Sequence, residues 1–336
     1  MSPFCPAALV VGRIVAPHRY FAEGLTTLTR HLALVRSTGI SHLLLLSGDT
    51  GAGKSFLLET FLVDTYQEVP EPVRTGEGIE LKAAVPQMPP NPTPKGLYAE
   101  ILRLYEITDI KSNDTASDLK RRTLAALKEC KTEILAIEEL QHLTDRTTLK
   151  TKHHVDDIFK VLHDSTPCLM VLSGLADELE AVVASNKQLV TRVRGHIHLP
   201  RFDWNKKDHR AEFIFCLEQF KEQIEAAGQS FPDLNNTKLK FDFRLYCATG
   251  GIMRLLANLL EEVLSTAGGS SCLNLEDFEN AYHTFRFRPE LKGIELEPFS
   301  TGFLDTPQHK LLNVVKLIGS EELRKKLQSK VSAKKK

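Results

Sequence analysis

A short stretch of the chain places three glycines before a lysine and a serine, and this combination can bind phosphate. The stretch is Gly48-Asp49-Thr50-Gly51-Ala52-Gly53-Lys54-Ser55. Glycines let the backbone turn its N–H groups inward around phosphate oxygens, and a following helix adds positive partial charge. Lys54 can then neutralise the β- and γ-phosphates, and the Ser55 hydroxyl can ligate Mg²⁺. The stretch therefore predicts a P-loop that binds a nucleoside triphosphate with Mg²⁺.

The elements that must position this loop are present on both sides of it. Residues 41–47 form an apolar run that is typical of a buried strand, and residues 56–61 have helical spacing. A strand, a glycine loop and a helix in this order is the context that a P-loop requires. A chance match to the glycine pattern would not come with this context.

A second apolar run, residues 133–139, ends in two acids, Glu138 and Glu139. In P-loop ATPases the first acid at such a strand end holds Mg²⁺, and the second polarises the attacking water. Aspartate is usual at the first place, so Glu138 would reach the metal with one more methylene. Taken alone, an apolar run that ends in acids is more often only the end of a strand.

Polar and basic residues near later strand ends are further candidates. Ser173 ends the apolar run 168–174 and would face the γ-phosphate or the attacking water, although a serine there is more often a cap. Arg192 and Arg194 precede the predicted strand 196–200. An arginine at that place can neutralise transition-state charge in a neighbouring subunit, and the alternative is a surface salt bridge. Arg254 lies in the first turn of a predicted helix, where the helix dipole disfavours a cation, so it is expected to face an anion.

The remaining pattern predicts mostly helices around these strands. An irregular N-terminal arm contains residues 16–20, which either pass over the nucleotide base or form a plain surface arm. The spacing of apolar residues predicts a strand over 79–85, irregular structure over the proline-rich residues 86–94, and six further helices. These helices cover residues 21–37, a segment capped by Thr93-Pro94, and residues 117–130, 206–227, 237–248 and 251–267.

Basic residues gather in two places before the last predicted strand. Lys120, Arg121 and Arg122 are expected to be exposed on the helix 117–130. Residues 146–154 are predicted to form a basic loop, which contains Lys150 and Lys152 and leads into a helix over 155–163. Such a loop is either solvated or in contact with nucleic-acid phosphates.

The C-terminal part adds a short helix over 275–285, an irregular aromatic segment that includes Phe285, Phe287 and Phe299, and a basic tail. The last 21 residues hold eight Lys or Arg and two Glu, although the whole chain has a net charge of zero. This balance argues against a protein that coats nucleic acid by bulk charge. The tail is predicted to form a lysine-rich helix from Ser320 that frays at its end.

The composition is that of an ordinary globular protein. The 336 residues are 42% hydrophobic and 26% charged, and no apolar run approaches the roughly 20 residues of a membrane span. The first residues lack the basic and apolar parts of a signal peptide. The six cysteines form no CxxC pair, so zinc is not expected, and they are typical of reduced thiols in a cytoplasmic protein.

Taken together, the order of these features resembles an AAA+ ATPase over about residues 20–268. The resemblance implies an α/β fold, in which a P-loop ATPase domain with a parallel central sheet is followed by a small all-helical lid. It implies an N-terminal arm (1–24), the nucleotide-binding domain (25–203), the lid (204–268) and a C-terminal partner-binding segment (269–336). It also implies roles for Gly48–Ser55 (Walker A), Glu138-Glu139 (Walker B), Ser173 (sensor 1), Arg192 (arginine finger) and Arg254 (sensor 2).

Within the AAA+ proteins the chain is similar to the TniB/TnsC family of transposition regulators. The similarity lies in Pro92-Thr93-Pro94-Lys95-Gly96-Leu97, Glu138-Glu139-Leu140-Gln141-His142-Leu143, Gln188-Leu189-Val190-Thr191-Arg192-Val193 and Glu297-Pro298-Phe299. The family often has Asn-Pro-Phe at the last of these places and Gly-Thr where this chain has Gly174-Leu175.

The resemblance implies a slow, Mg²⁺-dependent ATPase that assembles into rings or filaments on double-stranded DNA. It would connect a target-selection protein of the TniQ/TnsD type, alone or with an RNA-guided complex, to a transposase. Lys120, Arg121, Arg122, Lys150 and Lys152 are then the candidate DNA contacts. The basic tail and the aromatic segment would bind a partner, or the tail would only aid solubility.

Three other functions fit parts of the pattern. An origin-recognition-like initiator or loader usually adds a winged-helix domain of about 80–100 residues, for which the C-terminal residues do not have the pattern. A nucleotide-dependent signalling scaffold that does not bind DNA would carry a repeat or effector domain. A small-molecule kinase would have no use for the second strand-end acid.

Overall fold

The computed structural model describes residues 11–75, 78–145, 149–185, 187–267, 272–288 and 290–320. The chain divides into two units, which we name by their contents. The sheet unit comprises Tyr20–Asp49 and Gly53–Pro200. The lid unit comprises Arg201–Lys336 together with Met1–Arg19 and the P-loop tip, Thr50–Ala52.

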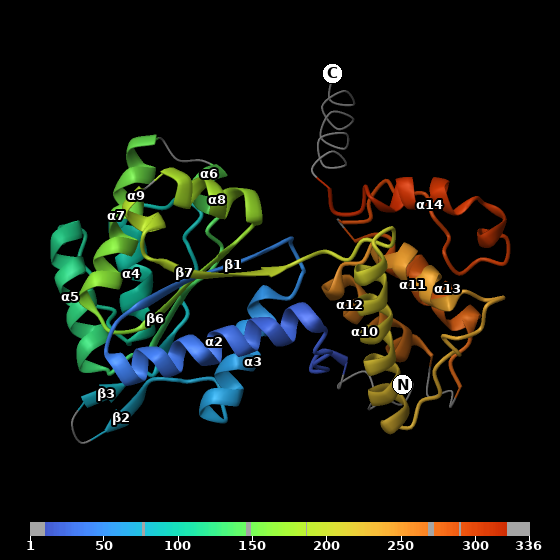
Figure 1. Cartoon of the computed structure of the whole chain (residues 1–336), viewed down its shortest axis with the longest axis horizontal. Coiled ribbons are helices and arrows are strands. Elements are labelled where there is room, and N and C mark those ends of the chain that lie inside the picture. The colour runs from blue at the N-terminus through green and yellow to red at the C-terminus, as the bar shows by residue number, and fades with distance from the viewer. Residues whose placement is uncertain are drawn as a thin grey trace. The chain divides into compact units, whose positions relative to one another are not determined.

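The sheet unit is built on a five-stranded parallel sheet (Figure 1). In spatial order its strands are β4 (Ala83–Ala84), β5 (Ile134–Ile137), β6 (Leu169–Gly174), β1 (His42–Gly48) and β7 (Val193–Leu199). All residues of β5 and β6 are buried, and so are all of β1 after His42. Strands that are covered on both faces need apolar residues throughout, which is why these segments are continuous apolar runs in the sequence.

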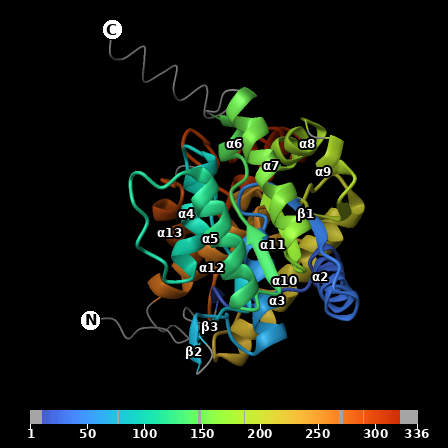
Figure 2. The same ribbon diagram turned by 90° about the vertical axis from the view of Figure 1, so that its left-hand side faces the viewer.

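Helices cover both faces of this sheet. On one face Leu43, Leu135 and Met170 belong to an apolar core that includes residues of α4, α5, α7 and α8. Figure 2 shows α5, α4 and α7 next to one another on this face. On the other face α2 runs beside α3, and Phe21 packs against Phe56 (Figure 1). The helices of this unit are α2 (Arg19–Thr38), α3 (Lys54–Tyr66), α4 (Pro94–Leu104), α5 (Ala116–Glu129), α6 (His142–Asp145), α7 (Leu149–Ser165), α8 (Ala176–Ser185) and α9 (Lys187–Val190).

Local signals placed several of these helices well. Thr93 caps α4 as predicted, because its Oγ1 accepts a hydrogen bond from the Gly96 N–H at 3.0 Å and Pro94 begins the helix. The helices predicted over 21–37 and 117–130 correspond to α2 and α5. Thr115 and Asp118 form a capping box at the start of α5, which fixes where that helix begins.

Three sequence predictions in this unit are wrong. The strand expected over 79–85 is two strands: β3 (Gly78–Glu80) pairs antiparallel with β2 (Val73–Thr75), whereas β4 joins the main sheet. The chain changes sheet there because the Leu81 N–H bonds to Cys130 O and the Lys82 carbonyl accepts from Glu133. The loop expected over 146–154 is helical from Leu149, while residues 146–148 lie outside the described chain. The last strand starts at Val193, so Arg194 lies inside it.

The lid unit is helical and has an aromatic core. Its helices are α10 (Lys207–Ala226), α11 (Phe241–Thr249), α12 (Met253–Thr266), α13 (Leu275–Phe285) and α14 (Gln308–Val315), with a 3₁₀ turn at Phe303–Asp305. Phe241 on α11 packs edge to face against Phe278 on α13, with ring centroids 4.8 Å apart. Edge-to-face pairs of this kind add to the stabilisation that the buried area provides.

The C-terminal aromatic segment belongs to this core. The Phe299 ring is 1% exposed and lies 5.4 Å from Phe278 and 5.8 Å from Tyr282, measured between ring centroids. Phe287, by contrast, is 76% exposed. Residues 272–288 and 290–300 therefore complete the lid unit, and Phe285 and Phe299 are not available to bind a partner. The basic tail beyond Ser320 lies outside the described residues.

The helix expected over 237–248 begins only at Phe241. The Asn236 side chain accepts hydrogen bonds from the N–H groups of Lys238 and Leu239, which holds these residues in a turn. Lys240 follows with a φ of 43°, a left-handed conformation that cannot continue a helix. A turn stabilised by one side chain therefore delays the helix.

No helix in the described part of the chain is long and apolar enough to cross a membrane. Cys130, Cys168, Cys216 and Cys247 are buried free thiols, Cys272 is exposed, and Cys5 lies outside the described residues. The α/β fold with a parallel central sheet followed by a helical region is confirmed.

Candidate functional site

The predicted P-loop forms a turn between β1 and α3. Gly48 packs so closely against the edge strand β7 that only glycine fits, because a Cβ there would lie 2.4 Å from Leu199 O. Gly53 has a φ of 100°, a conformation that favours glycine, and the helix starts at the next residue. The Lys54 ammonium donates to the carbonyls of Gly48 and Asp49 at 2.8 and 3.0 Å. The lysine therefore lies against its own loop, where a phosphate oxygen could replace the carbonyl oxygens.

Ser55 and Glu138 come together although they are 83 positions apart. The Ser55 hydroxyl donates a hydrogen bond of 2.6 Å to Glu138 Oε1. Glu138 is held by its backbone, since its N–H donates to Pro86 O and its carbonyl accepts from the Met88 N–H. Hence the longer glutamate still reaches the serine at the start of α3. A hydroxyl and a carboxylate oxygen that face each other are the ligand types that Mg²⁺ takes, so this pair fits the metal.

Glu139 has an unusual backbone. Its φ is 60°, in the left-handed region that residues other than glycine rarely adopt. Two backbone bonds fix this turn: the Leu140 N–H donates to Ser173 O and the His142 N–H donates to Glu139 O, each at 3.1 Å. The Gln141 amide donates to the Glu139 carboxylate. Such strain persists only where the surroundings enforce it, and it concentrates at functional sites.

Ser173 lies between the two motifs because of the strand order. Its strand, β6, separates β1 from β5, and its register partner on β1 is Leu46. The residue is 1% exposed, and its carbonyl is the acceptor that holds Leu140. The topology therefore places Ser173 next to the acidic turn, as its predicted role requires.

Arg192 is engaged within its own chain. Its Nε and Nη2 donate to the two carboxylate oxygens of Asp164 at 2.8 and 2.7 Å, and its Nη1 donates to Gln188 O. These hydrogen bonds hold the pKa of Asp164 well below its usual range. This bidentate pair is the salt bridge that the sequence left open as the alternative. Arg194 is exposed on β7.

Arg254 belongs to the lid unit, as does the P-loop tip. Its backbone N–H donates to Gly51 O at 3.1 Å. Its Nη2 lies 2.9 Å from Glu290 Oε1, so an acid offsets the unfavourable position of the cation near the start of α12. The Arg254 side chain therefore has an intramolecular acid as a partner. Its expected contact with a phosphate stays a prediction.

The N-terminal arm packs into the lid unit. His18 is 4% exposed, and its ring lies edge-on to Phe202 at 5.1 Å. Burial lowers the pKa of His18 to about 4, so the ring is neutral at pH 7. The Arg19 N–H donates to Glu212 Oε2 at 2.8 Å. The expectation that residues 16–20 cover a nucleotide base stays a prediction.

Comparison with known proteins decides the family. The family model described as "Bacterial TniB protein" matches residues 16–204, which is more than half of the chain. The chain belongs to the TniB family. No curated protein matches this TniB-family chain.

Solved structures show which fold the TniB-family chain adopts. The ORC2 protein of Aeropyrum pernix, in ADPNP–ADP complexes, is 14% identical over 85% of this chain and 70% of its own, with a TM-score of 0.56. CDC6P of Pyrobaculum aerophilum is also 14% identical over 84% of this chain and 71% of its own, with the same TM-score of 0.56. This chain therefore has the fold of an AAA+ P-loop ATPase.

The basic residues proposed to contact DNA have different environments in this TniB-family chain. Arg121 is exposed, but Lys120 and Arg122 are half-buried, so the expectation that all three are exposed is wrong. Arg122 pairs with Asp109 and lies 3.5 Å from an Asp114 carboxylate oxygen. Lys150 and Lys152 lie in α7, and their side chains are outside what the structure describes.

Two partners of the predicted site residues were missed from the sequence. Asp164 lies on α7, far along the chain from Arg192, and no spacing rule connects them. Glu290 lies in an irregular segment after α13 and gave no signal. The contact between Gln141 and Glu139 could have been predicted, because the two residues are two positions apart in the stretch that resembles the family.

Proposed function

We propose that this protein is an Mg²⁺-dependent ATPase that regulates DNA transposition by assembling on double-stranded DNA. The assembled state would connect a target-selection protein to a transposase. The observation that carries the proposal is the 2.6 Å contact between Ser55 and Glu138 in a TniB-family chain. It brings the end of the P-loop and the acidic strand end to one place, as ATP chemistry needs.

Each residue of the site has a role in this proposal. The Lys54 ammonium would exchange its loop carbonyls for phosphate oxygens. Ser55 and Glu138 would hold Mg²⁺, which neutralises phosphate charge when bound. Glu139, fixed in its left-handed turn, would orient and polarise the attacking water. Ser173 would bond the water or the γ-phosphate from the neighbouring strand.

Arg192 would act in a neighbouring subunit. To do so, its guanidinium must leave Asp164 for a phosphate, which is a more highly charged acceptor. Assembly would then depend on the γ-phosphate, because the interface gains a contact that ADP cannot supply. Hydrolysis through Glu139 would remove this contact and release subunits. Arg254, near the P-loop tip, would report the same state from the lid unit.

DNA would be held through its phosphates without reading of bases, which suits a protein whose target is chosen by a partner. Arg121 is the strongest described candidate because it is exposed. Arg122 is the weakest, since two carboxylates already neutralise it. Lys120, Lys150 and Lys152 complete the proposed contact set.

Electron microscopy of the protein with duplex DNA tests the proposal. We would compare ATP, a non-hydrolysable analogue, ADP and no nucleotide. Rings or filaments on DNA are expected only with ATP and the analogue. Glu139→Gln should bind ATP normally and keep the assemblies from dissociating, whereas the exposed Glu129→Gln should behave as the wild type.

Three results would contradict the proposal in different ways. Monomers in every condition would favour a nucleotide-dependent signalling scaffold. Assemblies that load a second ring-shaped protein onto DNA and do not stimulate a transposase would favour an initiator or loader. Glu139→Gln filaments that dissociate at the normal rate would remove Glu139 from hydrolysis.

A further inference from the structure

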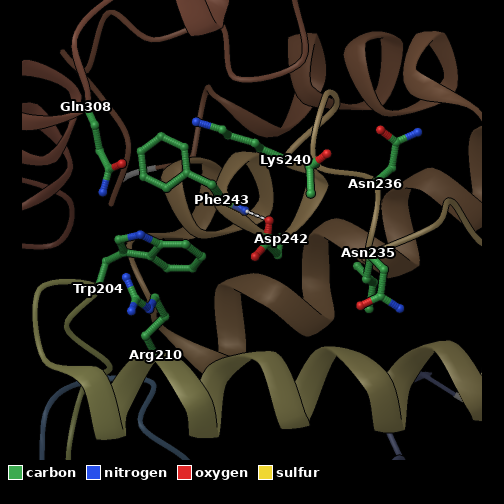
Figure 3. A pocket seen from close by; sticks show the side chains of 10 residues that line it. Trp204, Arg210, Asn235, Asn236, Lys240, Asp242, Phe243 and Gln308 are labelled. Atoms are coloured by element: carbon green, nitrogen blue, oxygen red, sulfur yellow. Dashed lines mark hydrogen bonds between the residues drawn. The ribbon is translucent and has the colours of Figure 1, made fainter.

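The lid unit contains a pocket that none of the predicted nucleotide or DNA residues lines. Its cavity volume is about 290 Å³, and Figure 3 shows its lining. The lining residues are Trp204, Arg210, Leu234, Asn235, Asn236, Thr237, Lys240, Asp242, Phe243 and Gln308. They come from the segment before α10 and its first turn, the turn before α11, the start of α11 and the start of α14.

Trp204 forms an aromatic wall of the pocket with only an edge left to bind a ligand. The side chain is 6% exposed. Its ring packs against Phe243 and Tyr246, with centroid distances of 5.2 and 5.0 Å, and against Phe213. Arg210 covers it as well, with Cζ 5.9 Å from the ring centroid. The indole N–H donates no hydrogen bond to a described residue and is not fully buried, so it can donate to a ligand.

Two cations line the pocket without an ion pair in the described part of the chain. They are Arg210, at the start of α10, and Lys240, just before α11. The single acid in the lining is Asp242. One of its oxygens already accepts the Phe243 N–H at 2.8 Å, and burial raises the pKa of this carboxyl, an effect that the nearby charges of Arg210 and Lys240 partly offset. The lining thus has a net positive charge and more donors than acceptors.

These features indicate what the ligand must provide. The donors on the wall are the Trp204 indole, the two cations and the amides of Asn235, Asn236 and Gln308. A ligand that satisfies them needs an anionic acceptor. A cavity of about 290 Å³ is just below the roughly 300–1,000 Å³ of ligand sites, so it holds one or two residues of a peptide.

We propose that this pocket binds an acidic side chain on a peptide segment of a partner protein. The carboxylate accepts hydrogen bonds from Arg210, Lys240 and the Trp204 N–H, and the adjoining apolar atoms rest against Phe243 and Leu234. Charge-assisted bonds to Arg are the strong ones in such a contact. The pocket gives the lid unit a means to recognise an acidic segment.

Nucleic acid fits the pocket less well. A base would need a free aromatic face on which to stack. Trp204 packs against three rings and Arg210 lies over it, so only the edge of the indole is free. A duplex backbone is too wide for a cavity of this size.

The single tryptophan of the chain makes the test specific, because intrinsic tryptophan fluorescence reports only on Trp204. We would select binders to the full-length protein from a random peptide library, synthesise them, and titrate them while recording fluorescence. The selected peptides should share an Asp or Glu beside an apolar residue and should change the fluorescence saturably. Replacing that acid with its amide should weaken binding about tenfold.

Variants of the protein complete the test. Arg210→Gln and Lys240→Gln should each weaken binding about tenfold, while Lys207→Gln, also on α10 but outside the lining, should not. Circular dichroism would verify that each variant is folded. Selected peptides without a shared acid, or equal affinity of Arg210→Gln and the wild type, would overturn the proposal. A saturable response to a short DNA duplex that requires Arg210 and Lys240 would also overturn it, in favour of nucleic acid.

Discussion

The two units have cores of different chemistry. The sheet unit is filled with aliphatic side chains such as Leu43, Leu135 and Met170, which come from buried strands. The lid unit adds a cluster of aromatic rings to its buried leucines, among them Phe278 from a helix and Phe299 from an irregular segment. A buried parallel strand must be apolar along its length, whereas a large ring fills space wherever the chain brings it. The difference teaches that the buried strands of the sheet unit can be recognised as apolar runs in the sequence, whereas the aromatic cluster of the lid unit cannot.

The candidate sites differ in the same way. In the sheet unit the chemical residues sit at the ends of strands, so their positions follow from the pattern. In the lid unit the pocket takes Trp204, Lys240 and Gln308 from separate elements, and no spacing relates them. Four experiments sharpen or break this comparison.

The largest expected effect concerns the aromatic core. Phe299→Ala should lower the free energy of unfolding of the lid unit by about 3–5 kcal/mol, because it empties a site between Phe241, Phe278 and Tyr282. Urea denaturation followed by tryptophan fluorescence measures this, since Trp204 lies in the same unit. Phe287→Ala is the matched control and should change the value by less than about 0.5 kcal/mol. Equal effects would mean that the C-terminal segment is not part of the core.

The second experiment asks whether Arg192 is more than an ion-pair partner. Arg192→Ala should lower the ATPase rate roughly 10³-fold while the nucleotide affinity of the monomer is unchanged. Steady-state hydrolysis and a binding titration separate the two. Asp164→Asn breaks the same pair but keeps the arginine, so it should retain most of the activity.

The Arg192 comparison has two contradicting outcomes. If Asp164→Asn loses as much activity as Arg192→Ala, the arginine acts only by stabilising its own fold. If Arg192→Ala abolishes nucleotide binding by the monomer, the arginine lies in cis or in the core.

The third experiment addresses the P-loop. Lys54→Ala should weaken ATP binding by roughly 100-fold, because a charge-assisted contact to phosphate is lost. A fluorescent ATP analogue gives the affinity directly. Lys128→Ala, which removes an exposed lysine from α5, serves as the control. Unchanged affinity in the Lys54 variant would break the assignment of the loop.

The smallest effect concerns the buried histidine of the lid unit. The pKa of His18 is lowered to about 4 in the folded chain. Between about pH 6.5 and pH 4 the unfolded chain therefore carries a proton on this ring and the folded chain does not. This contribution to stability is complete above pH 6.5 and is lost as the pH falls towards 4. Between pH 7 and pH 5 the loss should be about 2 kcal/mol.

Denaturation of His18→Gln at both pH values checks this linkage. The variant should show a smaller difference between pH 7 and pH 5 than the wild type. A dependence as steep as that of the wild type would assign the effect to other groups.

The sequence by itself determined the local architecture of the sheet unit. The P-loop, the buried strands that flank the site and the Thr93 cap all depend on residues close together in the chain. Such features need only backbone geometry and short-range hydrogen bonds, so the order of residue types is enough to predict them. The boundary errors occurred where hydrogen bonds redirect the backbone: main-chain bonds to Cys130 and Glu133 divide the strand expected over 79–85, and in the lid unit the Asn236 side chain delays α11.

Tertiary structure alone decided which distant residues meet. The strand order places β6 between β1 and β5, and this brings Ser173 beside the acidic turn and Ser55 to Glu138. Tertiary packing also placed Asp164 beside Arg192 in the sheet unit and buried Phe299 in the lid unit. These contacts depend on how whole elements pack. The free energy that favours one arrangement is a sum over the whole core, so no single residue of the sequence predicts it.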